Sequence, residues 1–212
     1  MKTNNTLSLA ILSTLGLAMG TASFSAQAIQ AGDMFARFTA TTVSPNDDST
    51  DFTGAAGVSP SVDSNTQLGA TFVYMIDNNI GFEVLAATPF SHDVSATGLG
   101  VVGETKHLPP TFSIQYYFNP ETKLRPYIGA GINYTTFFDS ETIPALGGDL
   151  DIDDSFGLAV QAGVDYDIDD KWFVTADVRY ISIETTATVA AVGSSDVDIN
   201  PTVFSIGVGY KF

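Results

Sequence analysis

Residues 125–138 read RPYIGAGINYTTFF, and their side chains alternate in character with a period of two. One set is apolar and ends in an aromatic ring: Ile128, Ala130, Ile132 and Tyr134. The other set is mostly small or polar: Tyr127, Gly129, Gly131, Asn133 and Thr135. Because successive side chains of a β-strand point to opposite faces, this alternation predicts a strand rather than a helix.

Seven further segments alternate in the same way, with apolar residues at every second position. They are residues 34–43, 66–75, 80–88, 111–118, 156–167, 172–183 and 203–212. Each is close to the roughly 9–11 residues that a tilted strand needs to cross a bilayer. Aromatic residues such as Tyr74, Trp172 and Tyr210 gather toward the ends of the apolar faces. This placement is typical of the interfacial girdles of membrane barrels.

The connections between these segments fall into two classes by length. Residues 76–79, 119–124 and 168–171 are short, whereas residues 44–65, 89–110, 139–155 and 184–202 are long. A soluble lipocalin-like barrel or sandwich, the alternative fold, gives no reason for such sorting. Outer-membrane barrels have short periplasmic turns and long extracellular loops. We therefore expect an all-β fold, an eight-stranded antiparallel transmembrane β-barrel in the cell outer membrane, with both termini periplasmic.

The composition limits the classes of function that remain. The chain has 212 residues, no cysteine, 15% charged residues and a formal net charge of -16. The acidic balance argues against nucleic-acid binding, which needs clusters of Lys and Arg. Because no run of 18 apolar residues follows the N-terminus, a spanning helix is excluded and closed strands must make any membrane crossing.

The N-terminus has the features of a secretory signal peptide over residues 1–28. Lys2 supplies a positive charge, residues 7–19 are apolar, and residues 26–28 read AQA, a small-x-small cleavage site. A short buried helix is the alternative. The barrel domain is then expected to cover residues 29–212.

Several stretches carry a resemblance to a known family, in order along the chain. They read NTQLG (65–69), NIGFEVLAATPF (79–90), HLPPT (107–111), RPYIGAGINYTTFFD (125–139) and GVDY (163–166). With these motifs the chain resembles the outer membrane protein W family. The resemblance implies a narrow, largely apolar lumen and passage of small hydrophobic molecules, with lateral exit into the membrane. The final residues 210–212 resemble the aromatic signal read by the barrel assembly machinery.

The face opposite the apolar one is expected to line the lumen. The candidate lumen and constriction residues are Leu85, Arg179, Arg37, Glu83, Asp177 and Lys211. Buried charges must pair, and the first and last strands of a closed barrel are neighbours. Arg37, Lys211 and Asp177 are therefore expected to form one network. Leu85 matches an apolar lumen position of the family, and Arg179 falls where some members carry an aromatic residue.

Two interpretations of this lumen stay open. The lumen of an eight-stranded barrel is only wide enough for side chains to fill it, which favours a structural plug. A conducting path is the other interpretation, with Leu85 and Arg179 as its constriction. At the barrel mouth, His107 precedes Pro109 and Pro110, which start a strand where no backbone donor is needed. These residues are expected to shape the mouth and a gap in the wall.

No catalytic or metal site is expected. His92 and His107 are the two histidines, and Ser91 beside His92 is a dipeptide without the nucleophile–base geometry of a barrel acyltransferase or protease. The acids in residues 149–154 lack the central glycine and terminal glutamate of a calcium loop. We therefore expect no enzymatic activity, no cofactor and no metal, and the lipid-modifying enzyme is the third hypothesis.

The function expected is that of a porin-like outer-membrane channel for small hydrophobic molecules in a Gram-negative cell envelope. The alternative is a loop-mediated receptor or adhesin on a plugged structural barrel. The partners expected are outer-membrane lipid and lipopolysaccharide, small hydrophobic solutes, and the barrel assembly machinery through Phe212, without nucleic acid. A closed barrel has no edge strand, so a monomer is expected.

Overall fold

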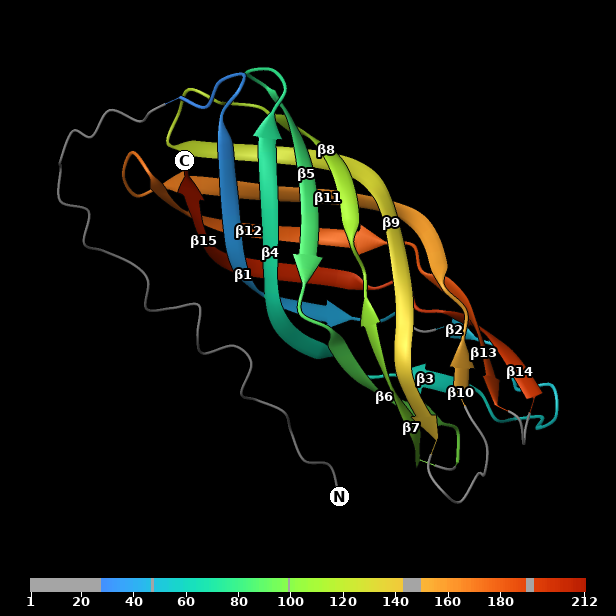
Figure 1. Ribbon diagram of the computed structural model, residues 1–212. Coiled ribbons are helices and arrows are strands. Elements are labelled where there is room, and N and C mark those ends of the chain that lie inside the picture. Colours follow the sequence, from blue (N-terminus) through green and yellow to red (C-terminus); the bar gives the residue numbers. More distant parts are fainter. Residues whose placement is uncertain (1–27, 47, 99, 143–149, 190–192) are drawn as a thin grey trace.

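Eight antiparallel strands close into a barrel in the order β11-β12-β15-β1-β4-β5-β8-β9, and β9 pairs again with β11 (Figure 1). They are β1 (Met34–Ser44), β4 (Asn65–Met75), β5 (Ile80–Ala87), β8 (Thr111–Tyr117), β9 (Leu124–Thr142), β11 (Ser155–Asp167), β12 (Trp172–Ile181) and β15 (Thr202–Lys211). The computed structural model describes residues 28–46, 48–98, 100–142, 150–189 and 193–212. Within these ranges no helix is long and apolar enough to span a membrane. The predicted all-β, eight-stranded barrel is confirmed.

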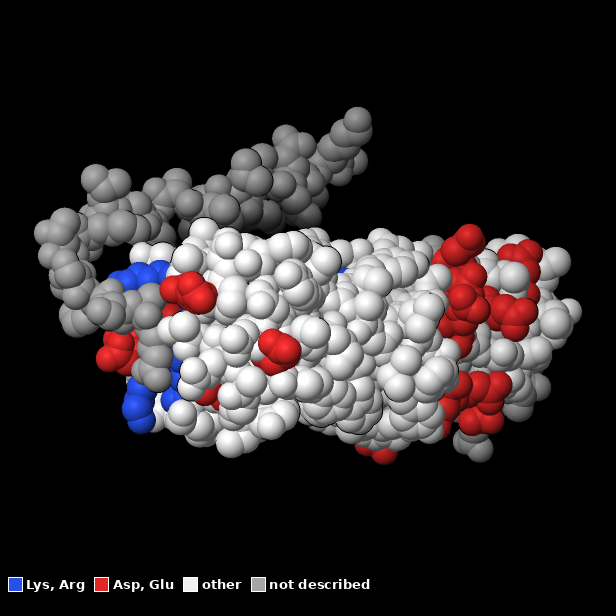
Figure 2. All heavy atoms as spheres, turned by 90° about the horizontal axis from the view of Figure 1, so that it is seen from above, with Lys and Arg blue, Asp and Glu red and all other residues white. Residues whose placement is uncertain are grey.

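The outer wall of the barrel is apolar, the reverse of a soluble protein. Large apolar side chains at alternate positions are exposed, among them Leu68 (71%), Phe156 (70%) and Ile206 (68%). Polar residues between them, such as Glu83 and Gln115, point inward and are buried. Figure 2 shows a nearly uncharged band between an end with Lys and Arg and an acidic end. A surface of this extent would associate in water, whereas lipid solvates it.

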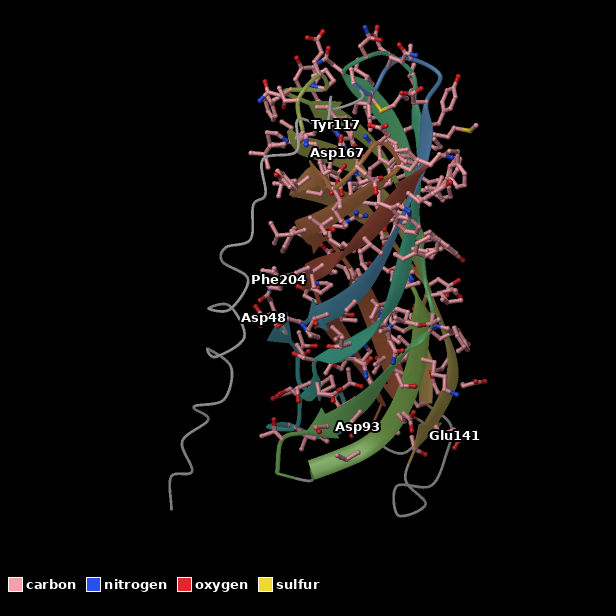
Figure 3. All side chains as sticks on the ribbon, turned by 90° about the vertical axis from the view of Figure 1, so that its left-hand side faces the viewer. Asp48, Asp93, Tyr117, Glu141, Asp167 and Phe204 are labelled. Atoms are coloured by element: carbon pink, nitrogen blue, oxygen red, sulfur yellow. The ribbon has the colours of Figure 1, made fainter. Side chains whose placement is uncertain are left out.

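The end of the barrel with the short connections is called the turn end. Its turns cover residues 76–79, 118–123 and 168–171, so the predicted short connections are confirmed. The amide of Ile29 donates to the carbonyl oxygen of Pro120 at 3.0 Å, and the amide of Phe212 donates to the carbonyl oxygen of Met34 at 3.1 Å. Both ends of the described chain therefore lie at the turn end, as do Tyr117 and Asp167 (Figure 3).

The opposite end is called the hairpin end, because its long connections contain strands that the sequence analysis did not anticipate. β6 (Phe90–Ala96) and β7 (Gly100–Leu108) form a hairpin that pairs with β3 (Pro60–Val62) on one side and with the extension of β9 on the other. A second sheet has the order β10-β13-β14-β2. Its members are β10 (Leu150–Ile152), β13 (Glu184–Val189), β14 (Gly193–Asp198) and β2 (Asp48–Ser49).

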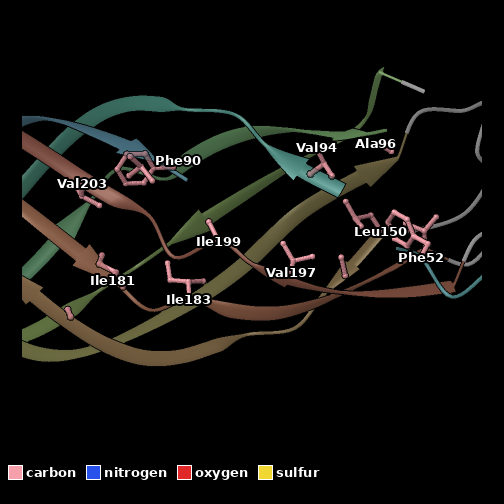
Figure 4. Packing of buried hydrophobic residues seen from close by; sticks show 14 residues of the cluster. Phe52, Phe90, Val94, Ala96, Leu150, Ile181, Ile183, Val197, Ile199 and Val203 are labelled. Atoms are coloured by element: carbon pink, nitrogen blue, oxygen red, sulfur yellow. The ribbon is translucent and has the colours of Figure 1, made fainter. Parts of the chain in front are cut away.

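A cluster of buried apolar side chains holds the hairpin end together (Figure 4). It includes Phe52, Phe90, Val94, Leu150, Ile181, Ile183, Val197, Ile199 and Val203. They come from the barrel strands, from both hairpin sheets and from the connections between them, where Phe52, Ile183 and Ile199 lie. Because each fully buried side chain of this kind contributes about 1.5–3 kcal/mol, the cluster stabilises the projecting hairpins against the barrel.

Acidic residues cover the outside of the hairpin end. Asp48, Asp93 and Glu141 are exposed there (Figure 3). Of the acidic stretch 149–154, residue 149 lies outside the described residues, and its other acids are exposed. No group of three metal-ligating side chains occurs in the part of the chain that was searched, the described residues.

Candidate functional site: the layered lumen

The barrel interior is divided into layers, which can be followed along two strands. The inward residues of β1, from the turn end to the hairpin end, are Phe35, Arg37, Thr39, Thr41 and Val43. Those of β5 are Gly81, Glu83, Leu85 and Ala87. On β5 the inward residues pass from a glycine, through a charge, to apolar residues, and on β1 they pass from an aromatic ring, through a charge and two threonines, to Val43. We call these the aromatic layer, the charged layer and the apolar chamber.

The aromatic layer closes the lumen at the turn end. Its buried members are Ile29, Phe35, Val73, Met75, Tyr117, Tyr127 and Phe173. The rings of Phe35 and Phe173 meet edge to face, with centroids 5.6 Å apart. Gly209 makes room for this packing, because a Cβ atom there would lie 2.0 Å from the Phe173 ring.

Glu83 is the centre of the charged layer. Its carboxylate accepts hydrogen bonds from Nη1 of Arg37 at 3.1 Å and from Nη2 of Arg179 at 2.8 Å. It also accepts from the side-chain amides of Gln115 at 2.7 Å and Gln161 at 3.1 Å. All five side chains are buried. A carboxylate so completely paired can remain ionised away from water.

Arg37 links the charged layer to the aromatic layer. It forms two hydrogen bonds with Asp165, at 3.1 and 2.8 Å, and donates to the hydroxyl of Tyr117 at 2.7 Å. Its guanidinium carbon also lies 4.7 Å from the ring centroid of Tyr127 and 5.1 Å from that of Phe35. Such bidentate pairing and ring stacking hold the arginine in one orientation.

The predicted network of Arg37, Lys211 and Asp177 was wrong. Arg37 bonds Glu83 and Asp165, Lys211 lies 2.7 Å from Asp167, and the nearest cation to Asp177 is Arg179, at 4.0 Å. The strand register explains the error. Asp177 is opposite Ser205 of β15, six residues before Lys211 and therefore about 20 Å along the strand.

The ionic group at the turn end includes residues that the sequence analysis did not name. Asp167 accepts from both Arg125 and Lys211, and Arg125 and Asp167 are almost completely buried. Arg125 shares the face of Tyr127, and Asp167 that of Asp165, so strand alternation could have identified both. Lys211 thus belongs to the turn end and not to the predicted constriction.

The apolar chamber occupies the lumen between the charged layer and the hairpin end. It contains two narrow cavities, an outer one of about 30 Å³ and an inner one of about 20 Å³. They share lining residues, among them Val43, His107 and Ile183. Leu85 lines the inner cavity and is 8% exposed. A cavity of this size holds one or two water molecules. The predicted constriction residues are therefore at different depths, with Leu85 in the chamber and Arg179 in the charged layer.

His107 is buried in the chamber as a neutral ring. It stacks on His92, with centroids 4.9 Å apart and planes inclined by 8°, and its centroid lies 5.5 Å from that of Phe90. Burial, assisted by the proximity of His92, lowers the pKa of His107 to about 3. This part of β7 therefore keeps its ring uncharged at neutral pH.

Prolines interrupt the wall beside the chamber. Pro109 and Pro110 separate β7 from β8, and both of these strands pair with β9. The side-chain amide of Asn133 donates to the two proline carbonyls at 3.2 Å each. This amide therefore satisfies carbonyl oxygens at the point where the two prolines, which have no N–H to donate, interrupt the ladder. The structure thus places the predicted mouth residues Pro109 and His107 beside the chamber.

A second interruption lies on the other side of the same hairpin. The β4–β5 ladder ends at the pair Gly69 and Ala87, and the β3–β6 ladder covers residues 94–96 of β6. Between them, no ladder pair with β3 or β4 is found for residues 90–93 in the described chain. Side-chain contacts cross this break, because Nδ1 of His92 and the amide of Asp93 both bond to Asp63.

Comparison with known proteins gives consistent matches over most of the chain. A model described as the OmpW family matches residues 30–212. Outer membrane protein W of Vibrio cholerae serotype O1 is 52% identical over 197 residues, which cover 86% of this chain and 90% of that protein. The crystal structure of the outer membrane protein OprG from Pseudomonas aeruginosa has a TM-score of 0.84 at 40% identity, covering 88% of this chain and 99% of that chain. A more distant relative, the dibenzothiophene metabolism operon protein PahQ of Pseudomonas aeruginosa, is 28% identical over 163 residues, or 74% of this chain and 76% of that protein.

Proposed function

Because the chain belongs to the OmpW family and is an outer-membrane β-barrel, we propose that it passes small hydrophobic molecules across the outer membrane. The observation that carries this proposal is the apolar chamber, which leads from the hairpin end to Leu85. The charged layer beyond it is filled by buried ion pairs. The relative PahQ supports an apolar solute, because its name refers to the metabolism of dibenzothiophene, an uncharged aromatic compound.

The path that we propose enters at the hairpin end and leaves through the wall. Leu85, Phe90 and Pro109 line the inner cavity, so both strand interruptions, at Phe90 and at Pro109, contribute a residue to it. A solute that leaves here reaches lipid without crossing the charged layer. This route avoids the cost of bringing an apolar molecule past buried ionic groups.

The proposed function is tested with the refolded barrel in liposomes. Entry of a small apolar compound is measured beside the conductance of simple ions. Uptake well above that of empty liposomes, with little ion current, is the result expected. If a folded barrel gave neither apolar uptake nor ion current, this result would contradict transport. Ion current alone would indicate a polar pore through the charged layer.

A receptor or adhesin on a plugged barrel is the second candidate. The filled charged layer and the exposed acids of the hairpin end favour it. Replacement of the β6–β7 and β13–β14 hairpin tips separates the two candidates. A receptor loses its partner when the tips change, whereas a channel keeps its solute flux.

The remaining parts of the cellular account are also proposals. Residues 1–28, of which 1–27 lie outside the described residues, are proposed as a signal peptide, and the family match begins at residue 30. Both termini are proposed to face the periplasm. Phe212, which is 72% exposed at the turn end, is proposed to be read by the barrel assembly machinery. We also propose that the barrel is a monomer and that lipopolysaccharide surrounds it in the membrane.

A further inference from the structure

One buried polar atom of the apolar chamber has no hydrogen-bond partner in the described part of the chain. Among the described residues that line the outer cavity, Nε2 of His92 is the side-chain polar atom that is sealed from solvent without a hydrogen bond. Neighbouring hydroxyls are engaged, since Thr105 bonds Ser140 at 2.8 Å and Thr135 donates to Asn133 at 2.7 Å. Leaving a buried polar atom unpaired costs free energy. A ligand that supplies the missing partner would recover it.

The other ring nitrogen of His92 determines the chemistry of this atom. Nδ1 lies 2.7 Å from the backbone carbonyl oxygen of Asp63. A carbonyl oxygen can only accept a hydrogen bond, so Nδ1 carries the proton. In a neutral imidazole the second nitrogen is then an acceptor. His92 lines the cavity, and its buried Nε2 carries an unpaired lone pair that calls for a donor.

The surroundings of His92 suit an otherwise apolar molecule. His107 stacks on one face of the ring at 4.9 Å. Aliphatic side chains such as Val94, Ile183 and Val197 line the cavity around it. The charged group nearest to the ring is the carboxylate of Asp63, which lies 3.6 Å from Nδ1 and is 56% exposed. A ligand here meets mostly apolar walls, the stacked ring of His107 and the unpaired Nε2 of His92.

We propose that His92 makes the chamber selective for small hydrophobic molecules that carry one hydrogen-bond donor, such as phenols, alcohols and N–H heterocycles. This inference rests on the proposed function, because it assigns a solute class to the same chamber. The cavity is about 30 Å³, so its side chains separate when a ring enters. A donor then pairs with Nε2, a hydrocarbon leaves it unpaired, and a molecule with only an acceptor repels its lone pair.

Binding of three molecules of similar shape tests the selectivity directly. p-Cresol offers a hydroxyl, p-xylene replaces it by a methyl group, and 4-methylanisole offers only an acceptor oxygen. Dissociation constants and the ¹⁵N resonance of Nε2 are measured on the folded barrel at pH 8. We expect p-cresol to bind about three- to tenfold more tightly than the other two, after correction for partition into detergent, and to shift the Nε2 resonance. Equal affinities, or an unmoved resonance, would overturn the proposal even without any variant.

Two substitutions locate the effect at Nε2. His92→Asn places an amide near the position of Nδ1, so it can still donate to the Asp63 carbonyl, but it removes Nε2. His92→Phe keeps a ring to stack on His107. In each folded variant we expect the affinity for p-cresol to fall to that for p-xylene, and a preference that survives both would overturn the proposal.

Liposome uptake separates this inference from the proposed function. Equal uptake of p-cresol and p-xylene by the unaltered barrel would overturn the selectivity and leave transport intact. Preferential binding of p-cresol without uptake of either compound would support the site and contradict transport.

Discussion

Glu83 and Arg179 meet across the full width of the barrel, where Nη2 of Arg179 donates to the Glu83 carboxylate at 2.8 Å. Their strands lie on opposite walls, because β15, β1 and β4 separate β12 from β5 on one side and β8, β9 and β11 on the other. The ion pair therefore closes the axis just beyond Leu85. The plugged and the open interpretations of the lumen thus apply to different depths of one barrel.

Removal of Arg179 is predicted to open the axis to ions. Arg179→Ala shortens a side chain that reaches across the lumen and leaves Glu83 with Arg37 as its remaining cation. We expect higher ion conductance in planar bilayers and a loss of about 3–5 kcal/mol in the free energy of unfolding, because one partner of a buried pair is removed. Lys106→Ala is the control, since Lys106 pairs with Asp139 on the exposed surface. Unchanged conductance in folded Arg179→Ala would show that the axis is closed elsewhere.

A methyl group at Gly209 is predicted to disturb the aromatic layer. The added Cβ atom would lie 2.0 Å from the Phe173 ring, so the ring must move against the packed side chains around it. We expect Gly209→Ala to lower the free energy of unfolding by about 1–3 kcal/mol, measured by urea titration in lipid vesicles. The double variant Gly209→Ala with Phe173→Leu should recover part of this loss. Strictly additive losses would show that the two side chains do not compete for space.

Acid is predicted to loosen the hairpin end through His107. The pKa of the buried ring is lowered to about 3 from its ordinary value of 6.5. An opened hairpin end would bind a proton below about pH 6.5, whereas the closed end would not until about pH 3. The free energy that keeps it closed therefore falls as the pH decreases through this window, and is constant above it.

Amide exchange in β6 and β7 measures this loosening. We expect exchange, corrected for its intrinsic pH dependence, to become faster between pH 6.5 and 4 in the unaltered protein. His107→Phe keeps an aromatic ring and removes the titration, so its corrected rates should stay nearly constant. The same pH dependence in both proteins would assign the loosening to another group.

The direction of each barrel side chain could be predicted from the sequence, because period-two alternation fixes it locally. Phe38 and Phe204 are more than half exposed, whereas Arg37 and Arg179 are almost completely buried. The strand positions follow from the same signal. Which inward charges meet could not be predicted, because that depends on how far neighbouring strands are shifted along one another. Lys211 and Asp177 are on neighbouring strands and still lie far apart.

The hairpin end was harder to read from the sequence. Phe90, His92, Val94 and Ala96 are buried alternately in β6, but the residues between them are Ser and Asp, which are common in loops. The sequence predicts no catalytic role for the two histidines and gives no sign that they meet. Their stacking depends on the β6–β7 pairing, in which Phe90 lies opposite His107, and short-range patterns do not report such pairing.

The measurement that tests the central claim most directly is apolar uptake by a barrel whose chamber is filled. Leu85→Trp replaces the isobutyl side chain by a larger indole ring that fills the inner cavity of about 20 Å³, at a cost in stability of about 1–3 kcal/mol. Liposomes with the folded variant should take up a small apolar compound at least several-fold more slowly than those with the unaltered barrel, while the low ion conductance stays the same. Uptake at the unaltered rate in folded Leu85→Trp would contradict a path through the apolar chamber.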